Sequence, residues 1–159
     1  MKQKLKLLFA ALMLLMMSGP SWGQTYQKVT SLSIGDEVLL VCDNAGMEFS
    51  SYSTTGTVYG IGVAFQTSPN GVYPFTVVAG ANSGTFAFKD ANGNYMYWTS
   101  GNSLNKNATL SDKTSWNVSF DNDGNAAITN ANTPARQIWW NVSSPRFACY
   151  TGKTAGTSY

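Results

Sequence analysis

The stretch Gly84–Trp98 constrains the fold of this chain more than any other, because it reads as two alternating arms around a turn. Phe86 and Phe88 lie on the same side of the first arm, and an aromatic-rich second arm alternates in the same way. Asn92-Gly93 separates the arms, and this dipeptide favours a tight hairpin turn in which both residues take positive φ. A period of two excludes an amphipathic helix here, so the stretch predicts a β-hairpin.

The same pattern recurs along the chain. Ser115–Thr129 is a looser copy with Asp121–Asn125 as its turn, and Glu37–Tyr52 reads as a degenerate first copy. Nothing after the first 23 residues shows sustained helical periodicity. About ten short strands separated by turns predict an all-β fold, either a β-trefoil-like arrangement of hairpins or a small closed barrel, with a β-sandwich as the alternative.

Two other segments predict strands with a particular role. Glu37–Cys42 is an unbroken apolar run of strand length, and such runs are typical of strands that are covered on both faces. Val58–Gln66 alternates strictly and carries Gly60, Gly62 and Ala64 on one face, which allows a neighbouring element to approach closely. Further strands are expected at Met47–Tyr52, Tyr73–Ala79, Arg136–Asn141 and Arg146–Tyr150.

Residues 1–23 have the layout of a secretory signal peptide. Lysines precede an apolar run, Leu7–Met17, that is too short to span a bilayer as a helix. Small residues at Ser21 and Gly23 predict cleavage after Gly23, and no cysteine follows the run to carry a lipid anchor. We therefore expect a signal peptide (1–23) and a single all-β domain (24–159) that is secreted, periplasmic or displayed on the outer cell surface.

Loss of the leader changes the charge of the chain. The full sequence has 10 Lys and Arg against 8 Asp and Glu, and 3 lysines lie in the leader, so the mature balance is 7 against 8, or −1. A nucleic-acid-binding protein needs a basic face, and no cluster of Lys or Arg remains to form one. No second long apolar segment exists, so no membrane insertion is expected. The remaining 136 residues suit one monomeric domain.

The sequence offers little material for catalysis or for a metal site. It has no histidine, which removes the most common general base and metal ligand, and two cysteines alone cannot form a zinc site. Asp121–Asn125 gathers oxygen ligands but lacks the remaining spacing of an EF-hand loop. Glu48 alone among the carboxylates lies beside aromatic residues, which does not make the pair needed for glycoside hydrolysis. We expect no enzyme activity, no metal and no cofactor.

Several spaced aromatic and turn residues resemble those of one all-β domain. These residues are Lys28-Val29-Thr30, Gly35-Asp36, Val38–Cys42, Phe86, Phe88, Asp90, Ala91, Gly93, Tyr95, Trp116 and Pro145–Tyr150. The domain recurs in exported proteins of Bacteroides-type bacteria, often beside secreted nucleases or other surface modules. Related copies continue to a final apolar strand, whereas Thr151–Tyr159 is polar, so the resemblance implies that the closing strand is replaced or missing. The hairpin Phe86–Trp98 also resembles the strand-turn-strand unit of β-trefoils.

Cys42 and Cys149 leave two alternatives open. An even cysteine count in an exported protein favours a disulfide. The bridge would close a loop of about a hundred residues, for which the chain-entropy account gives roughly 4–5 kcal/mol of stabilisation. Both residues also lie in apolar runs, where free cysteine packs as a small hydrophobic side chain.

Two adjacent tryptophans mark the candidate ligand site. On a strand, Ile138 and Trp140 share one face, and this apolar pair should point to the core. Trp139 then points outward between Gln137 and Asn141, so that two amides flank a flat ring. Such a surface suits a sugar, because the apolar face of a sugar stacks on the ring and amides bind its hydroxyl groups.

The same parity predicts a further aromatic surface on the central hairpin. Met96 and Trp98 should point inward, and Tyr95 and Tyr97 outward as additional platforms. The alternative is that a loop such as Thr99–Thr114 covers these rings.

Two functions from different classes remain. The favoured one is a non-catalytic binding module, secreted or on the cell surface, with a glycan as ligand at Trp139, Gln137, Asn141, Tyr95 and Tyr97. The alternative is a structural or protein-interaction domain, such as an adhesin, that has a surface protein as its partner and no small ligand.

Overall fold

The computed structural model describes residues 26–65 and 72–152, so the expected leader (1–23) and the last residues of the chain (153–159) lie outside the described part. Twelve strands of this part form one antiparallel sheet, and two 3-10 helices of three residues each accompany them. The predicted all-β fold is confirmed.

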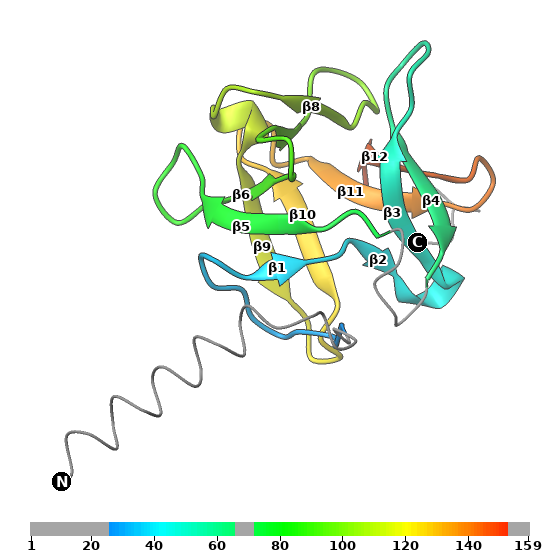
Figure 1. Cartoon of the computed structure of the whole chain (residues 1–159), viewed down its shortest axis with the longest axis horizontal. Helices are drawn as coiled ribbons and strands as arrows, with labels where there is room; N and C mark the ends of the chain where they lie inside the picture. The colour runs from blue at the N-terminus through cyan, green and yellow to red at the C-terminus, as the bar shows by residue number, and fades with distance from the viewer. Residues whose placement is uncertain (1–25, 66–71, 153–159) are drawn as a thin grey trace, which may run out of the picture.

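The strands follow one another around the molecule (Figure 1). Their bounds are β1 (Glu37–Val38), β2 (Val41–Cys42), β3 (Met47–Tyr52), β4 (Gly60–Ala64), β5 (Phe75–Ala79), β6 (Phe86–Lys89), β7 (Tyr95–Tyr97), β8 (Asn105–Asn107), β9 (Trp116–Phe120), β10 (Ala126–Asn130), β11 (Arg136–Asn141) and β12 (Arg146–Thr151). The 3-10 helices are η1 (Asp43–Ala45) and η2 (Asp112–Thr114).

The sheet has a threefold pattern. Strands β1, β5, β6, β9 and β10 lie side by side in that order, and each pair of neighbours is antiparallel. The hairpins β7–β8 and β11–β12 attach to this row through β6 and β10, and the hairpin β3–β4 pairs with β12 on one side and with β2 on the other. Three hairpins in one antiparallel sheet agree with the trefoil-like arrangement among the predicted alternatives.

The sheet does not close into a barrel, so the predicted closed barrel is wrong. Within the described residues, β1 pairs with β5 alone and β2 pairs with β3 alone, so the two ends of the sheet do not pair with each other. The N-terminal segment contacts β1 and the loop between β9 and β10 through side chains. The Tyr26 hydroxyl donates to Glu37 Oε1 at 2.9 Å, and Lys28 Nζ donates to Asn125 Oδ1 at 2.8 Å.

The apolar run Glu37–Cys42 forms two strands, which corrects the prediction of one strand covered on both faces. β1 pairs with β5 and β2 pairs with β3, so the chain changes its partner strand between Val38 and Val41. At the change, the Leu40 carbonyl accepts a hydrogen bond from the Phe49 N–H at 2.9 Å. The residues from Val38 to Cys42 are half-buried, because each short strand has its core on one side only.

The glycine face of β4 packs against the core, as the alternation of Val58–Gln66 predicts. A Cβ atom on Gly60 would collide with the ring of Phe49, and one on Gly62 would collide with the ring of Trp140. The absence of a side chain at these two positions therefore makes room for two large aromatic residues.

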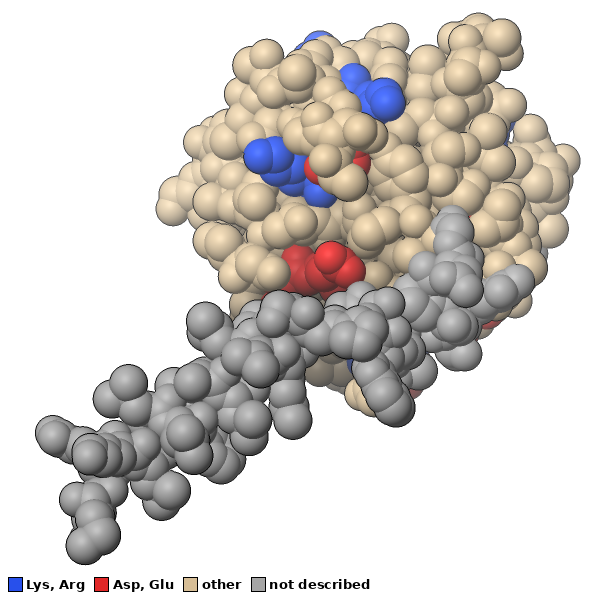
Figure 2. Space-filling model, viewed as in Figure 1, with Lys and Arg blue, Asp and Glu red and all other residues tan. Residues whose placement is uncertain are grey.

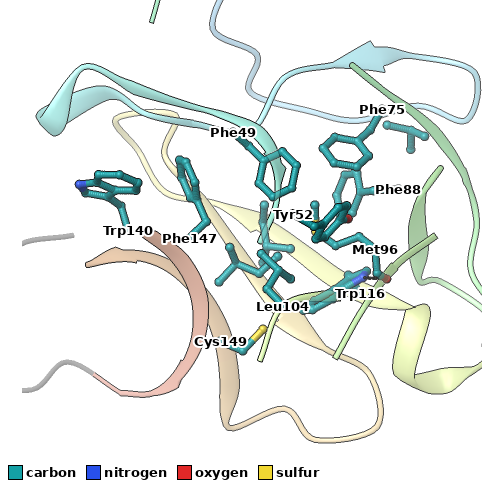
Figure 3. Close-up of a cluster of buried hydrophobic side chains, with 13 residues drawn as sticks. Phe49, Tyr52, Phe75, Phe88, Met96, Leu104, Trp116, Trp140, Phe147 and Cys149 are labelled. Atoms are coloured by element: carbon teal, nitrogen blue, oxygen red, sulfur yellow. Dashed lines mark hydrogen bonds between the residues drawn. The ribbon is translucent and has the colours of Figure 1, made fainter. Parts of the chain in front are cut away.

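Most of the core is aromatic (Figure 3). Its largest fully buried side chains are Trp116, Phe49, Phe75, Phe147, Met96 and Leu104. The rings of Trp140, Phe147 and Phe49 form a row, with centroid separations of 4.9 Å and 6.0 Å. The indole N–H of Trp116 donates to the Met96 carbonyl at 3.2 Å, so its burial leaves no donor unsatisfied.

The turn at Asn92-Gly93 differs from the predicted two-residue turn. Gly93 has a φ of 84°, whereas no non-glycine residue of the described chain has positive φ. The loop instead starts at Asp90, whose carbonyl accepts from the Gly93 N–H at 3.0 Å and whose N–H donates to the Asn94 carbonyl at 2.7 Å. Asp90 Oδ1 also accepts from the N–H groups of Asn92 and Asn94 at 2.9 and 2.8 Å, which fixes the loop.

The predicted hairpin Ser115–Thr129 is confirmed. Its loop, Asp121–Asn125, joins β9 to β10, and β10 pairs onward with β11. The side chain of Asn130 holds the following loop much as that of Asp90 does. Asn130 Oδ1 accepts from the N–H groups of Asn132 and Thr133 at 3.2 and 3.3 Å.

Cys42 and Cys149 are free thiols, so the disulfide alternative is not realised. In the strand order β12-β4-β3-β2, two strands separate β12, which carries Cys149, from β2, which carries Cys42. Cys149 points into the core (Figure 3). Burial raises the pKa of the Cys149 thiol to about 12, so this thiol stays protonated at neutral pH.

We expect iodoacetamide to modify Cys42 in the folded protein well before it modifies Cys149. The thiolate is the reacting form, and Cys149 is both protonated and 0% exposed. Mass spectrometry of peptides after a timed reaction measures the two rates, and unfolding in guanidinium is the control in which both thiols react. A peptide pair joined through these cysteines in unreduced protein would contradict the structure.

The surface in the view of Figure 2 is largely uncharged. Lys and Arg side chains are few and lie apart from one another, and the acidic side chains form small separate groups. None of the helices in the described ranges has the length and apolar character needed to cross a membrane.

Candidate functional site

The parity of β11 places Trp139 as the sequence predicts. Ile138 and Trp140 are buried, at 7% and 5% exposure, and Trp139 between them is half-buried on the opposite face of the strand. Gln137 is also half-buried on that outer face.

The neighbouring strand adds residues that the sequence analysis did not single out. β12 pairs with β11 so that Tyr150 lies opposite Gln137, Ala148 opposite Trp139, and Arg146 opposite Asn141. Residues directly opposite one another in an antiparallel pair share a face of the sheet. We call this outer surface the Trp139 face: Gln137, Trp139 and Asn141 on β11, and Arg146, Ala148 and Tyr150 on β12.

Tyr59 directly precedes β4 and adds an aromatic ring beside the Trp139 face. Phe147 of β12 pairs with Gly60, the first residue of β4, and both positions face the core. The Arg146 guanidinium carbon is 5.2 Å from the centre of the Tyr59 ring, which is the geometry of a cation–π contact. Arg146 thus joins the Tyr59 ring to the Trp139 face.

Two hydrogen bonds hold the polar part of the face together. Arg146 Nε donates to the Tyr150 hydroxyl at 3.2 Å, and Asn141 Nδ2 donates to the same oxygen at 3.0 Å. Asn141 Oδ1 accepts from the Ser144 N–H at 3.0 Å. Asn141 is buried and its amide is bonded at both ends, so it orients Tyr150 and the following turn instead of presenting a free amide to a ligand.

A hollow of about 230 Å³ opens beside the face. Thr57, Tyr59, Asn102 and Arg146 line it. Arg136, which is not among the described lining residues, orients the side chain of Asn102: its Nη1 donates to Asn102 Oδ1 at 2.9 Å. The loop Thr99–Thr114, which was the candidate cover for the aromatic rings, thus borders the hollow through Asn102.

Tyr95 and Tyr97 belong to a different hairpin from Trp139. Both are half-buried on β7, and β8 places Asn107 opposite Tyr95 and Asn105 opposite Tyr97. Lys89 Nζ lies 5.7 Å from the centre of the Tyr95 ring. These residues form a second aromatic and amide surface, separate from the Trp139 face by strand pairing.

Trp98 packs against the core that contains Met96, as predicted, but it is less buried than Met96. Met96 is 1% exposed, whereas Trp98 lies beyond the end of β7 and is half-buried. Its indole N–H donates to the Gly101 carbonyl at 3.0 Å. Lys113 Nζ and the Arg136 guanidinium lie 5.5 and 5.9 Å from the centre of its ring.

The sequence indicates the face of the strand on which Arg146 and Tyr150 lie, but not the residues beside them. Both alternate with the apolar residues Phe147 and Cys149, which indicates the outer face of a strand. Nothing in the sequence indicates which positions of β11 lie opposite them. Within the described residues, no three His, Cys, Asp or Glu side chains come together in a way that could hold a metal ion.

Comparisons with known proteins show a similarity of fold. No protein-family model matches the chain, and no curated protein matches its sequence. The chain is similar to part of the solved structure of a mosquitocidal holotoxin, with a TM-score of 0.58 and 8% sequence identity over 79% of this chain. It spans 17% of the length of that toxin chain. At this identity the likeness shows a shared β-rich fold alone.

Proposed function

We propose that the protein is an exported, non-catalytic binding module and that its ligand is a glycan that stacks on Trp139. The observation that carries the proposal is the pair of half-buried rings of Trp139 and Tyr59, the first opposite Ala148 on β12 and the second beside Arg146. Such rings offer an apolar surface with a polar rim. Signal-peptide features of the leader and the resemblance to an exported all-β domain support a site outside the cell.

Hydrogen-bonding groups surround the rings of Trp139 and Tyr59. The Gln137 amide lies at one end, and Tyr150, Arg146 and Asn102 lie along the side next to the hollow. A glycan needs both kinds of contact, since stacking gives affinity for the ring and polar groups select the hydroxyl pattern. Tyr95 and Tyr97, each opposite an asparagine, are a second platform on which a longer chain of sugars can rest.

We expect residues 24–159 to bind glycans on an array and Trp139→Ala to weaken the binding at least tenfold, which equals about 1.4 kcal/mol. Trp139→Phe keeps an aromatic ring and should retain most of the affinity. Val142→Ala changes an exposed side chain in the turn after β11 and serves as the matched control. The purified protein should release no reducing sugar from any glycan that it binds.

A second function is supported by a different observation. Ile61 and Val63 lie on the outer face of β4 and are 40% and 41% exposed, so this strand presents an apolar strip to solvent. Such a strip suits a protein partner, as in a structural or adhesin-like domain. The absence of any signal on the glycan array, together with a stable complex that Ile61→Ser and Val63→Ser abolish, would favour this function over glycan binding.

A further inference from the structure

The hollow beside the Trp139 face contains a guanidinium group that is only partly used. Arg146 Nε donates to the Tyr150 hydroxyl at 3.2 Å, and the guanidinium carbon lies 5.2 Å from the centre of the Tyr59 ring. In the described part of the chain, the two Nη groups of Arg146 have no hydrogen-bond acceptor from the protein. An arginine held at Nε and in contact with a ring has lost part of its side-chain freedom, so its remaining donors are preorganised for a ligand.

The surroundings of the hollow favour negative charge. None of the described residues that line it is an Asp or Glu. Arg136 lies directly behind Asn102 and donates to its Oδ1 at 2.9 Å, which adds a second cation close to the hollow. Lys113 lies over the same Trp98 ring as Arg136. The local potential is therefore positive although the mature chain carries no net positive charge.

We infer that the hollow binds the acidic group of a sugar, a carboxylate or a sulfate, with both oxygens on the Nη groups of Arg146. This inference rests on the proposed glycan function, because it gives the sugar next to Trp139 a chemical class. A planar guanidinium with two free donors matches an oxyanion in a two-point contact, which a neutral hydroxyl cannot form. Asn102 Nδ2 and the Thr57 hydroxyl lie in the same lining and are available for the ring hydroxyls. The hollow is smaller than the roughly 300–1,000 Å³ of drug-sized ligand sites, so it suits one sugar unit.

The test compares acidic polysaccharides with their own neutral forms. The carboxylate arm uses polygalacturonate, alginate and hyaluronan, each beside the same polymer after its carboxyl groups have been reduced to alcohols. The sulfate arm uses dextran sulfate beside dextran. Binding to residues 24–159 is measured by biolayer interferometry at two salt concentrations. We expect at least one acidic polymer to bind about tenfold more tightly than its neutral form, with a preference that falls at higher salt.

Two variants locate the preference in the hollow. Arg146→Gln removes the charge and should abolish the preference for the acidic form, so that an acidic polymer and its neutral form bind this variant with equal affinity. Asn102→Asp retains the acceptor for Arg136 and adds a carboxylate to the lining, so it should repel the acidic polymers without removing a structural contact. This second variant keeps the test valid if Arg146→Gln fails to fold. Circular dichroism and a denaturant melt establish that each variant is folded.

The outcomes separate this inference from the proposed function. If acidic and neutral forms bind equally and Trp139→Ala weakens both, the glycan function stands and the acidic class is overturned. If the preference exists but survives in Arg146→Gln and Asn102→Asp, the hollow is not its site and the inference is overturned. If no polymer and no glycan on the array binds, the proposed function fails and the inference fails with it.

Discussion

Replacing Trp140 with alanine should lower the free energy of unfolding by about 3–5 kcal/mol, the range for removal of a large aromatic side chain from a core. Trp140 is 5% exposed, and its ring lies 4.9 Å from that of Phe147 and against the glycine position at Gly62. A smaller side chain would leave a cavity between the β11–β12 hairpin and β4 that backbone movement cannot fill.

Trp139→Ala is the matched control, because it removes the same side chain one residue earlier from the opposite face of β11. Trp139 is half-buried, so we expect a loss of about 1 kcal/mol or less. Denaturant melts of the two variants and the wild-type protein measure both values. Large and equal losses would show that both indoles belong to the core, and the Trp139 face would then lose its role as an exposed platform.

Asp90→Ala should cost about 2–3 kcal/mol of stability, because it removes the shared acceptor of several donors. Asp90 is 5% exposed and accepts from the backbone N–H groups of Asn92 and Asn94 and from the Tyr73 hydroxyl at 2.8 Å. Burial and the bond to Asp90 raise the pKa of Tyr73, so this hydroxyl remains a donor at neutral pH. Asp90→Asn keeps one acceptor oxygen and should cost less.

Asp121 provides the control for Asp90, because it forms the same loop contacts on the surface. Its Oδ1 accepts from the N–H groups of Asp123 and Asn125 at 3.0 and 2.8 Å. Asp121→Ala should therefore cost far less than Asp90→Ala in the same denaturant melts. Hydrogen bonds from Asn125 lower the pKa of Asp121. Its contribution is present above the pKa of the unfolded chain and is lost as the pH falls through the lower pKa of the folded state. A larger loss at Asp121 than at Asp90 would contradict this assignment.

Local sequence patterns predicted the parts of the fold that depend on one strand at a time. The alternation at Val58–Gln66 indicated the side of β4 that packs closely, and the parity of Ile138 and Trp140 indicated the core side of β11. Both predictions hold because a buried face needs apolar or small residues at every second position. The same reasoning placed Trp139 on the outer face.

Features that depend on the partner strand were not predictable from the sequence. Glu37–Cys42 looks like one buried strand, but its division into β1 and β2 follows from the change of partner from β5 to β3. Tyr59 and Arg146 meet because β4 and β12 pair at Gly60 and Phe147, which are far apart in the sequence. Register between such strands is set by packing of the whole sheet and has no local sequence signal.

The strand order has a consequence for how the chain folds. The strand order of the whole sheet begins at β1 and ends at β2. Both ends of the sheet therefore lie in the single segment Glu37–Cys42. The pairing of Phe147 with Gly60 that joins the last hairpin to the first spans most of the domain. Contacts between such distant residues require loop closure before they contribute stability, which slows folding to roughly the millisecond-to-second range of non-local β-proteins. In a newly made chain, β4 therefore lacks its second partner strand until β12 has been synthesised.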